Sequence, residues 1–307
     1  MGGSGVTATI SIIIPTKDRP GLLTHAVRSA LLALPDEGEV IVVDDRSAAP
    51  TEQALAFIDD PRLRLVRNER PAGPAGARNF GVSVAHGTTV LFLDDDDLML
   101  PGYPAQVLRL RHSAPEALYG FSSIVPFRGD RDPDTLIEHQ AGHAMLVASL
   151  EPFRKRLAGL GCGFWIDRNL FVTLGGIAED ILVNEDTEFS VRLLAHGVAG
   201  LFSPEPGVAV RQHNSVGGGD LGSLTQRTDA LRRAGFFGEI IRRQEVWLAT
   251  QPKARRHLMR RQLKFLARER KIATALRVIA AETRFGHRLG LMAYFGLSRL
   301  TETLRRR

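Results

Sequence analysis

The first hundred residues alternate between short, continuous apolar runs and longer segments with a helix-like spacing of apolar positions. Continuous runs indicate strands buried on both faces of a sheet, because half-exposed strands alternate apolar and polar residues. Strands that alternate with helices indicate right-handed β-α-β units. The sequence therefore predicts an α/β fold with a Rossmann-like, mostly parallel sheet. The predicted strands cover 10–14, 40–43, 63–66 and 90–93, and the predicted helices cover 20–34, 51–58 and 76–85.

Acidic residues follow two of these runs where the strand ends. Four aspartates, Asp94 to Asp97, come directly after the fourth run, and Asp44 and Asp45 come after the second. Ligands of open parallel sheets bind beyond the carboxyl ends of the strands. Four adjacent carboxylates repel one another unless a cation lies among them, and their oxygens suit Mg²⁺ or Mn²⁺. The pattern favours a metal site, and the alternative is a solvated acidic turn before the helix that follows Pro101.

The segments after the second and third strands carry groups that suit a nucleotide. A carboxylate at the second strand's end can accept a hydrogen bond from a base or a ribose, although an aspartate-rich turn has the same pattern. A glycine-rich loop at 67–79 leads into a helix whose first N–H groups favour anions, and Arg78 can bind a diphosphate with two hydrogen bonds. The loop lacks the Gly-Lys-Ser signature of phosphate loops, which argues against ATPase chemistry.

The remainder of the chain predicts a second region of helices. Residues 127–140 are typical of a surface loop, and 184–195 predict a helix. Trp165 lies in a glycine-flanked segment and could either form an apolar wall of a binding site or pack in the core. After residue 224 the spacing is helical and arginine-rich to the end. We therefore expect a flexible N-terminus at 1–8, a catalytic domain at 9–223 and a basic helical region at 224–307.

The net charge of +6 hides a strong asymmetry. Residues 226–307 hold 21 of the 40 Lys and Arg residues but only 6 of the 34 Asp and Glu residues. Such a tail suits an anionic partner, and basic amphipathic helices lie on anionic membranes. The alternatives are packing on the catalytic body or on a second copy of the chain. No aromatic-rich surface accompanies the charge, which argues against nucleic acid.

Cysteine content and hydropathy indicate the compartment. The single cysteine, Cys162, excludes an intrachain disulfide and a cysteine-based zinc site. The first residues lack the basic and apolar regions of a signal peptide, and no apolar run reaches the ~18–20 residues that span a bilayer. These features predict a cytoplasmic protein whose basic tail could reach the inner face of the membrane.

In this order and spacing, the motifs resemble those of inverting family 2 glycosyltransferases, which have the GT-A fold of nucleotide-diphospho-sugar transferases. The resemblance covers about residues 9–215. The segments that carry it are ISIIIPTKDRP at 10–20, VVDDRS at 42–47, ARNFG at 77–81, FLDDDD at 92–97 and NEDTEFSVRL at 184–193. Two positions depart from the family pattern: Asp18 stands where Asn is usual, and Lys17 stands where an aromatic residue is common.

The resemblance implies a role for each matching residue. Asp186 is the expected catalytic base, and Asp96 is the expected ligand of Mn²⁺ or Mg²⁺, with His213 as a weaker candidate. Glu185 and Trp165 are candidates for the acceptor side. The residues implied to bind the nucleotide-sugar are Pro15, Thr16, Asp18, Arg19, Asp45, Arg78, Asp94 and Asp95.

The implied activity is transfer of a sugar from a nucleoside diphosphate sugar to a hydroxyl of a glycan or glycolipid, as in bacterial polysaccharide synthesis. UDP is the default nucleotide because Asp45 suits a base N–H. Two other functions compete with this one. A nucleotidyltransferase can share the sheet and the metal site but has no need of a base at Asp186. An inactive nucleotide-sugar binder is disfavoured because every expected acidic position is filled. Neither the sugar nor the oligomeric state is predicted.

Overall fold

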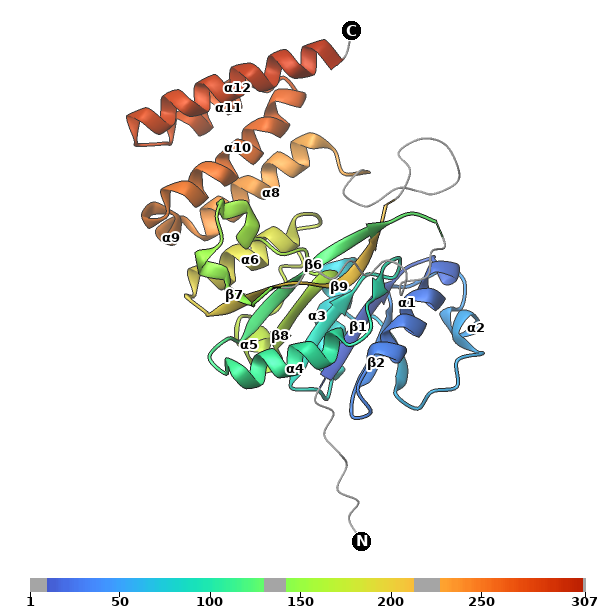
Figure 1. Ribbon diagram of the computed structural model, residues 1–307. Coiled ribbons are helices and arrows are strands. Elements are labelled where there is room, and N and C mark those ends of the chain that lie inside the picture. The colour runs from blue at the N-terminus through green and yellow to red at the C-terminus, as the bar shows by residue number, and fades with distance from the viewer. Residues whose placement is uncertain (1–9, 130–141, 213–226, 306–307) are drawn as a thin grey trace. The chain divides into compact units, whose positions relative to one another are not determined.

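The computed structural model describes residues 10–129, 142–212 and 227–305. The chain divides into two compact units. The first, which we call the sheet unit, comprises residues 1–150, 158–186 and 197–215, and the second, the helical unit, comprises 151–157, 187–196 and 216–307. Of the described part of the predicted 9–223 domain, the segments 151–157 and 187–196 therefore group with the helices of the tail (Figure 1).

The sheet unit contains all the strands and helices predicted for the first hundred residues. In chain order they are β1 (Ile10–Thr16), α1 (Pro20–Ala33), β2 (Glu39–Asp44), α2 (Thr51–Leu55), β3 (Leu63–Arg67), α3 (Pro74–Val84) and β4 (Thr89–Leu93). The continuous apolar runs form strands with both faces covered, since every residue of β2 and β4 is buried. The predicted α/β fold is confirmed.

Further strands extend this sheet on the far side of β4. They are β5 (Leu98–Met99), β6 (Tyr119–Phe127), β7 (Met145–Leu146), β8 (Cys162–Asp167) and β9 (Gly200–Arg211), and the helices between them are α4 (Tyr103–Ser113) and α5 (Arg168–Thr173). The strand order is β3-β2-β1-β4-β8-β6-β9-β5, with β7 paired to β9. Strands β3, β2, β1 and β4 are parallel, whereas β8 runs antiparallel to both β4 and β6.

The parallel half of the sheet brings its strand ends to one edge. In the register of β1 and β2, Thr16 pairs with Asp44, and β4 runs parallel on the other side of β1. The acidic run at 94–97 therefore emerges beside the loops that follow β1 and β2. This edge is where the predicted binding residues gather.

Trp165 belongs to the core of the sheet unit. Its side chain is 1% exposed and packs with the apolar residues of β1, β2 and β4. A Cβ at Gly120 would overlap its ring, so this glycine makes room for the indole. Of the two predicted roles, the structure places Trp165 in the core rather than on a wall facing a sugar.

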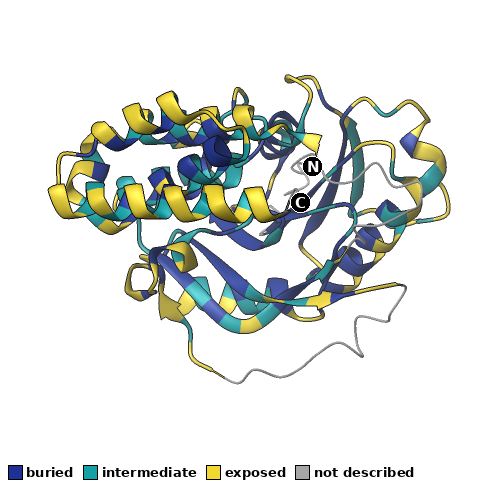
Figure 2. Ribbon diagram, turned by 90° about the horizontal axis from the view of Figure 1, so that it is seen from above, coloured by how far each residue is buried: buried dark blue, intermediate teal, exposed yellow. Residues whose placement is uncertain are grey.

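The helical unit has a core of its own. After α6 (Glu185–Ala195), which begins in the sheet unit, its helices are α8 (Ala230–Arg243), α9 (Glu245–Thr250), α10 (Pro252–Arg268), α11 (Ile272–Ala280) and α12 (Phe285–Arg305). Phe237 and Phe265 stack with ring centroids 5.9 Å apart, and the guanidinium of Arg233 lies 4.3 Å above the Phe265 ring. Buried dark-blue positions alternate with exposed yellow ones along these helices (Figure 2). No helix among the described ranges is long and apolar enough to cross a membrane.

Candidate active site

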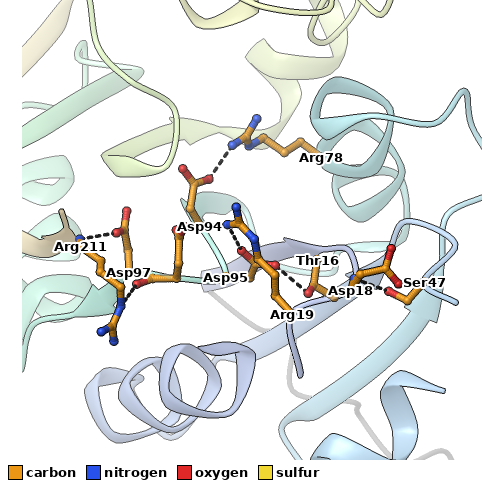
Figure 3. Close-up of polar contacts among 10 residues, drawn as sticks. Thr16, Asp18, Arg19, Ser47, Arg78, Asp94, Asp95, Asp97 and Arg211 are labelled. Atoms are coloured by element: carbon orange, nitrogen blue, oxygen red, sulfur yellow. Dashed lines mark hydrogen bonds and ion pairs between the residues drawn. The ribbon is translucent and has the colours of Figure 1, made fainter. Parts of the chain in front are cut away.

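The four aspartates after β4 are each held by a different set of partners. Their partners come from the end of β1 and the loop after it, from α3 and from the end of β9 (Figure 3). The contacts are Arg78 Nη2 to Asp94 Oδ1 at 2.6 Å, Thr16 Oγ1 to Asp95 Oδ2 at 2.7 Å, Arg19 Nη1 to Asp96 Oδ2 at 2.7 Å, and the Arg211 backbone N–H to Asp97 Oδ1 at 2.8 Å. The run is therefore a built cluster rather than a solvated turn.

The carboxylates of this cluster carry more negative charge than the neighbouring arginines neutralise. The pKa of Asp95 is raised to about 6, because burial and, to a smaller extent, repulsion from Asp96 outweigh the lowering effect of the Thr16 hydrogen bond. Burial raises the pKa of Asp97 to about 8, and the charges of Asp94 and Asp96 add to this. Carboxylates whose pKa values rise in this way would be stabilised in the charged form by an added cation.

The same residues can be tested for their fit to a divalent metal. Within the described ranges, no group of three or more His, Cys, Asp or Glu side chains is arranged around a common point. Mg²⁺ in nucleotide sites typically has only one or two carboxylate ligands, with water and substrate phosphate completing its shell. Asp96 meets that requirement, and the unbalanced charge of its neighbours favours a cation. The predicted ligand His213 lies outside the described residues.

The loops after β1 and β2 are tied to each other by Asp18. This residue has a φ of +55°, in the left-handed region that Asp adopts more readily than most residues. Its Oδ1 accepts a hydrogen bond from Ala48 N at 2.7 Å, and its own N–H donates to Ser47 Oγ at 3.0 Å. Pro15 and Thr16 end β1 directly before this loop. Asp18 thus holds in place the two loops that the resemblance assigns to the nucleotide.

Asp45 connects β2 to the glycine-rich loop. Its Oδ1 accepts from Asn68 Nδ2 at 2.6 Å, and its Oδ2 accepts from Gly73 N at 2.8 Å. Gly73 precedes α3 with a φ of +128°, a conformation that favours glycine. Both carboxylate oxygens of Asp45 therefore have partners within the chain, each with lone pairs to spare for a further donor.

Arg78 bridges the acidic run and the start of α6. The residue is 5% exposed, and its Nη1 lies 3.3 Å from Glu185 Oε1 while its Nη2 binds Asp94. Burial raises the pKa of Glu185 to about 7, Arg78 opposes the rise, and the charge of Asp186 adds to it. The buried guanidinium of Arg78 therefore forms ion pairs with two carboxylates, those of Asp94 and Glu185.

Asp186 lies in the first turn of α6, beside this bridge. Asn184 precedes the helix with a φ of +67°, which turns the chain sharply into it. The charge of Asp186 raises the pKa of Glu185 and also that of the Cys162 thiol. Asp94, Arg78, Glu185 and Asp186 therefore form one electrostatic group, although Arg78 and Glu185 are 107 positions apart in the sequence.

Three residues support the site that the sequence did not single out. Asn68 binds Asp45, and Arg211 donates through Nε to the Asp96 carbonyl at 3.0 Å. A Cβ at Gly161 would overlap the carboxylate of Asp94, so the glycine makes room for that side chain. Each of these residues supports the site through a contact with a residue that is not its neighbour in the sequence. Of the three, only Gly161 lies in a segment that the sequence pattern had marked, the glycine-flanked segment around Trp165.

Substituting Gly161 with alanine is expected to destabilise the fold by about 1–3 kcal/mol, the usual cost of overpacking. The added methyl group would displace Asp94 from Arg78. Urea unfolding measures the loss, and Gly235→Ala in α8 is the control because a Cβ there meets nothing within 4 Å. If Gly161→Ala is as stable as the parent chain, then Asp94 can move away from the added methyl group without a loss in the free energy of unfolding.

The fold and the acidic edge define the class of protein. A parallel half-sheet with an acidic run after its fourth strand, extended by antiparallel strands, is the GT-A type of nucleotide-diphospho-sugar transferase fold. Residues 11–171 match the family model described as "Glycosyl transferase family 2". That match covers more than half of the 307 residues, and the chain belongs to this family.

Individual proteins are similar over smaller segments or in fold alone. The Campylobacter jejuni GalNAc(5)-diNAcBac-PP-undecaprenol beta-1,3-glucosyltransferase is 38% identical over 96 residues, 30% of this chain and 31% of that protein. This chain spans 26% to 31% of the length of several curated relatives that it matches. Staphylococcus aureus TarS 1-349 in complex with UDP-GlcNAc has a TM-score of 0.66 at 17% identity, over 97% of this chain and 91% of that one. GalNAc-T7 with UDP, GalNAc and Mn²⁺ has a TM-score of 0.55 at 20% identity, over 68% and 45%.

Proposed function

We propose that this chain transfers a sugar from a nucleoside diphosphate sugar, with UDP as the nucleotide, to an acceptor hydroxyl with inversion at the anomeric carbon. The observation that carries the proposal is the cluster of four carboxylates at the carboxyl end of β4, which is held by residues from the end of β1 and its following loop, from α3 and from the end of β9. Membership of the family and the UDP ligand of the similarly folded TarS structure support it.

The donor would be bound along the strand-end edge. Asp45 would accept a hydrogen bond from the base, with Asn68 and the Gly73 N–H fixing its carboxylate. Thr16, Asp18, Arg19 and Asp95 would surround the nucleoside, and the backbone of Pro15 would lie beside the base. The hydrogen bonds of Thr16 with Asp95 and of Asp18 with Ala48 would keep these segments in position for the ligand.

A divalent cation, Mn²⁺ or Mg²⁺, would be held by Asp96, and His213 is proposed as a second ligand. Such an ion supplies Lewis-acid stabilisation of the leaving diphosphate. GalNAc-T7, which shares the fold, was solved with Mn²⁺. Arg19 pairs with Asp96 and Asp95 at 2.7 Å and 3.3 Å and adds positive charge to the same cluster.

Asp186 would act as the general base. As the acceptor oxygen forms its bond to the anomeric carbon, the proton of that hydroxyl passes to the Asp186 carboxylate, and the bond from the anomeric carbon to the diphosphate oxygen breaks. Arg78 would hold Asp94 and Glu185 in place beside the reacting groups. One displacement from the face opposite the diphosphate inverts the configuration.

The acceptor is proposed to be a glycan on a lipid carrier at the cytoplasmic face of the membrane. The Campylobacter relative is named for a diphospho-undecaprenol substrate, and its similarity to this chain lies in a segment of 96 residues. Glu185, at the start of α6, is the residue we place nearest to the acceptor. The identity of the sugar is left to experiment.

Calorimetry with UDP, dTDP, GDP, ADP and CDP, each with and without Mn²⁺, tests the proposal. We expect UDP to bind at least about tenfold more tightly with Mn²⁺ than without, since the ion links a carboxylate to the diphosphate. Asp96→Ala should remove the metal enhancement, whereas Asp36→Ala, at an exposed aspartate before β2, should retain it. If none of the nucleotides binds in either condition, the proposed function is wrong.

A further inference from the structure

The outer face of α12 is apolar and exposed. Six large apolar side chains of this helix are 45% to 73% exposed, whereas Leu291 and Phe295 on the opposite face are 0% and 6% exposed. Neighbouring members of this set lie three to five residues apart, which places them along one side of the helix. Seen from above, α12 is the long, mostly yellow helix that ends at the label C (Figure 2). The exposed side chains, which we call the α12 stripe, are Phe285, Leu289, Met292, Leu297, Leu300 and Leu304.

Negative charge near the stripe is neutralised within the helical unit. Glu302 is the only acidic residue of α12, and its Oε1 lies 3.1 Å from Arg268 Nε. Glu282, just before the helix, is 1% exposed and pairs with Arg255 at 3.3 Å. These two carboxylates are therefore paired with arginines, whereas Glu269, at the end of α10, is exposed.

A small cavity with three arginines opens beside the stripe. Its volume is about 90 Å³, and its lining is Ala267, Arg268, Arg270, Arg299, Glu302 and Thr303. Arg299 follows Met292 by seven residues and so lies on the same side of α12. Arg270 and Arg299 are exposed, and neither forms an ion pair with a carboxylate in the described parts of the chain. A water needs about 10–15 Å³ of such a cavity, so a phosphate group can be accommodated.

We infer that the α12 stripe and this cavity form a docking surface for an anionic phospholipid membrane. The apolar side chains would enter the boundary between headgroups and acyl chains, with the helix lying in the plane of the surface. Arg270 and Arg299 would bind headgroup phosphates, and arginine recognises phosphate through its planar fork of N–H donors. The inference does not depend on the transfer of a sugar.

Charge favours a membrane over a second copy of the chain as the occupant. Residues 226–307 carry 21 Lys and Arg against 6 Asp and Glu, so pairing two stripes would bring two strongly basic surfaces together. An anionic bilayer instead attracts such a surface, with each basic residue near it contributing about fivefold in binding. A set of exposed apolar side chains along one side of a helix also indicates an interaction site.

Flotation of the full chain with lipid vesicles tests the inference. We expect binding to vesicles of phosphatidylcholine with 30% phosphatidylglycerol, loss of binding at high salt, and little binding to phosphatidylcholine alone. The double variant Leu297→Gln/Leu300→Gln should weaken binding at least about tenfold, since it removes apolar side chains from the stripe. Leu32→Gln, at an 87% exposed leucine of α1, is the matched control and should bind as the parent does.

A charge variant tests the cavity separately. Arg270→Gln/Arg299→Gln should weaken binding to the anionic vesicles by about tenfold or more, whereas Arg109→Gln, at an exposed arginine of α4, should not. Equal binding to both kinds of vesicle, or equal losses in the control variants, would overturn the inference. So would a change from dimer to monomer in the leucine variant by light scattering, because the stripe would then bind a second copy. UDP calorimetry on the same variants measures nucleotide binding independently of vesicle binding. A failure of the membrane inference can therefore be told apart from a failure of the proposed function.

Discussion

Replacing Asp186 with asparagine is expected to reduce sugar transfer by about 10²- to 10⁴-fold, the usual contribution of a general base. Asparagine fills nearly the same space but cannot accept the proton of the acceptor hydroxyl. Donor binding should stay within about twofold, because the contacts proposed for the nucleotide come from the loops after β1 and β2 and from the acidic run. Initial rates with a UDP-sugar, together with UDP calorimetry, measure both effects.

Two further variants make this prediction specific. Asp36→Asn, the same substitution at an exposed site before β2, should leave the rate unchanged. Glu185→Gln tests the neighbouring carboxyl, whose pKa burial raises to about 7. Near-normal turnover by Asp186→Asn and loss of turnover in Glu185→Gln would transfer the role of base to Glu185.

Replacing Arg78 with methionine is expected to destabilise the chain by about 3 kcal/mol and to abolish measurable transfer. Removing one partner of a buried ion pair costs about 3–5 kcal/mol, because the remaining charge stays buried without compensation. We expect a loss at the lower end of this range because the Asp94 side chain is 37% exposed and water can partly solvate its charge. The Glu185 side chain is 14% exposed and accounts for most of the loss. Urea unfolding measures the stability, with Arg109→Met as the control at an exposed arginine of α4.

The stability loss of Arg78→Met should depend on pH. The pKa of Glu185 in the folded chain lies above its ordinary value, so its charged form opposes folding above about pH 7, and protonation relieves this as the pH falls. Loss of Arg78 raises that pKa further, because the guanidinium favours the charged form. The deficit should therefore be larger at pH 8 than at pH 6.

A double variant separates charge from shape at this bridge. Arg78→Met/Glu185→Gln should recover a large part of the lost stability at pH 8, since the uncompensated carboxylate is gone. It should not recover transfer, because Asp94 remains without its partner. Recovery of transfer would show that Arg78 acts only by neutralising Glu185.

The sequence by itself determined the parallel half of the fold. The runs at 10–14, 40–43 and 90–93 are apolar at every or nearly every position, and such a strand can be buried only between two layers. The helices between them have lengths that suit crossovers, so the sheet and its ligand edge follow from local pattern alone. The family resemblance rested on the ends of these strands together with 77–81 and 184–193, and the family is confirmed by the match over residues 11–171.

Only the tertiary structure decided how the far half of the sheet is built. Strand β8 pairs antiparallel between β4 and β6, and β9 pairs with β6 over a distance of about eighty residues. Pairing between distant strands depends on packing and loop closure, which leave little trace in a local pattern. The position of Trp165 also could not be read from the local pattern. Its indole ring is buried in the core because Gly120, on the neighbouring strand, has no side chain to occupy the same space.

For the site as well, the sequence indicated the candidate residues, and the folded structure was needed to show which of them contact one another. The chain's residue types and strand ends indicated Asp94 to Asp97, Asp45 and Arg78 as candidates, since carboxylates and arginines suit a metal and a diphosphate. The pairing of Arg78 with Glu185, of Asp45 with Asn68, and of the Arg211 N–H with Asp97 joins residues far apart in the chain. Such pairs arise because burial forces each charged or polar group to find a partner wherever the folded chain supplies one, and that choice is made by the packing of the whole unit.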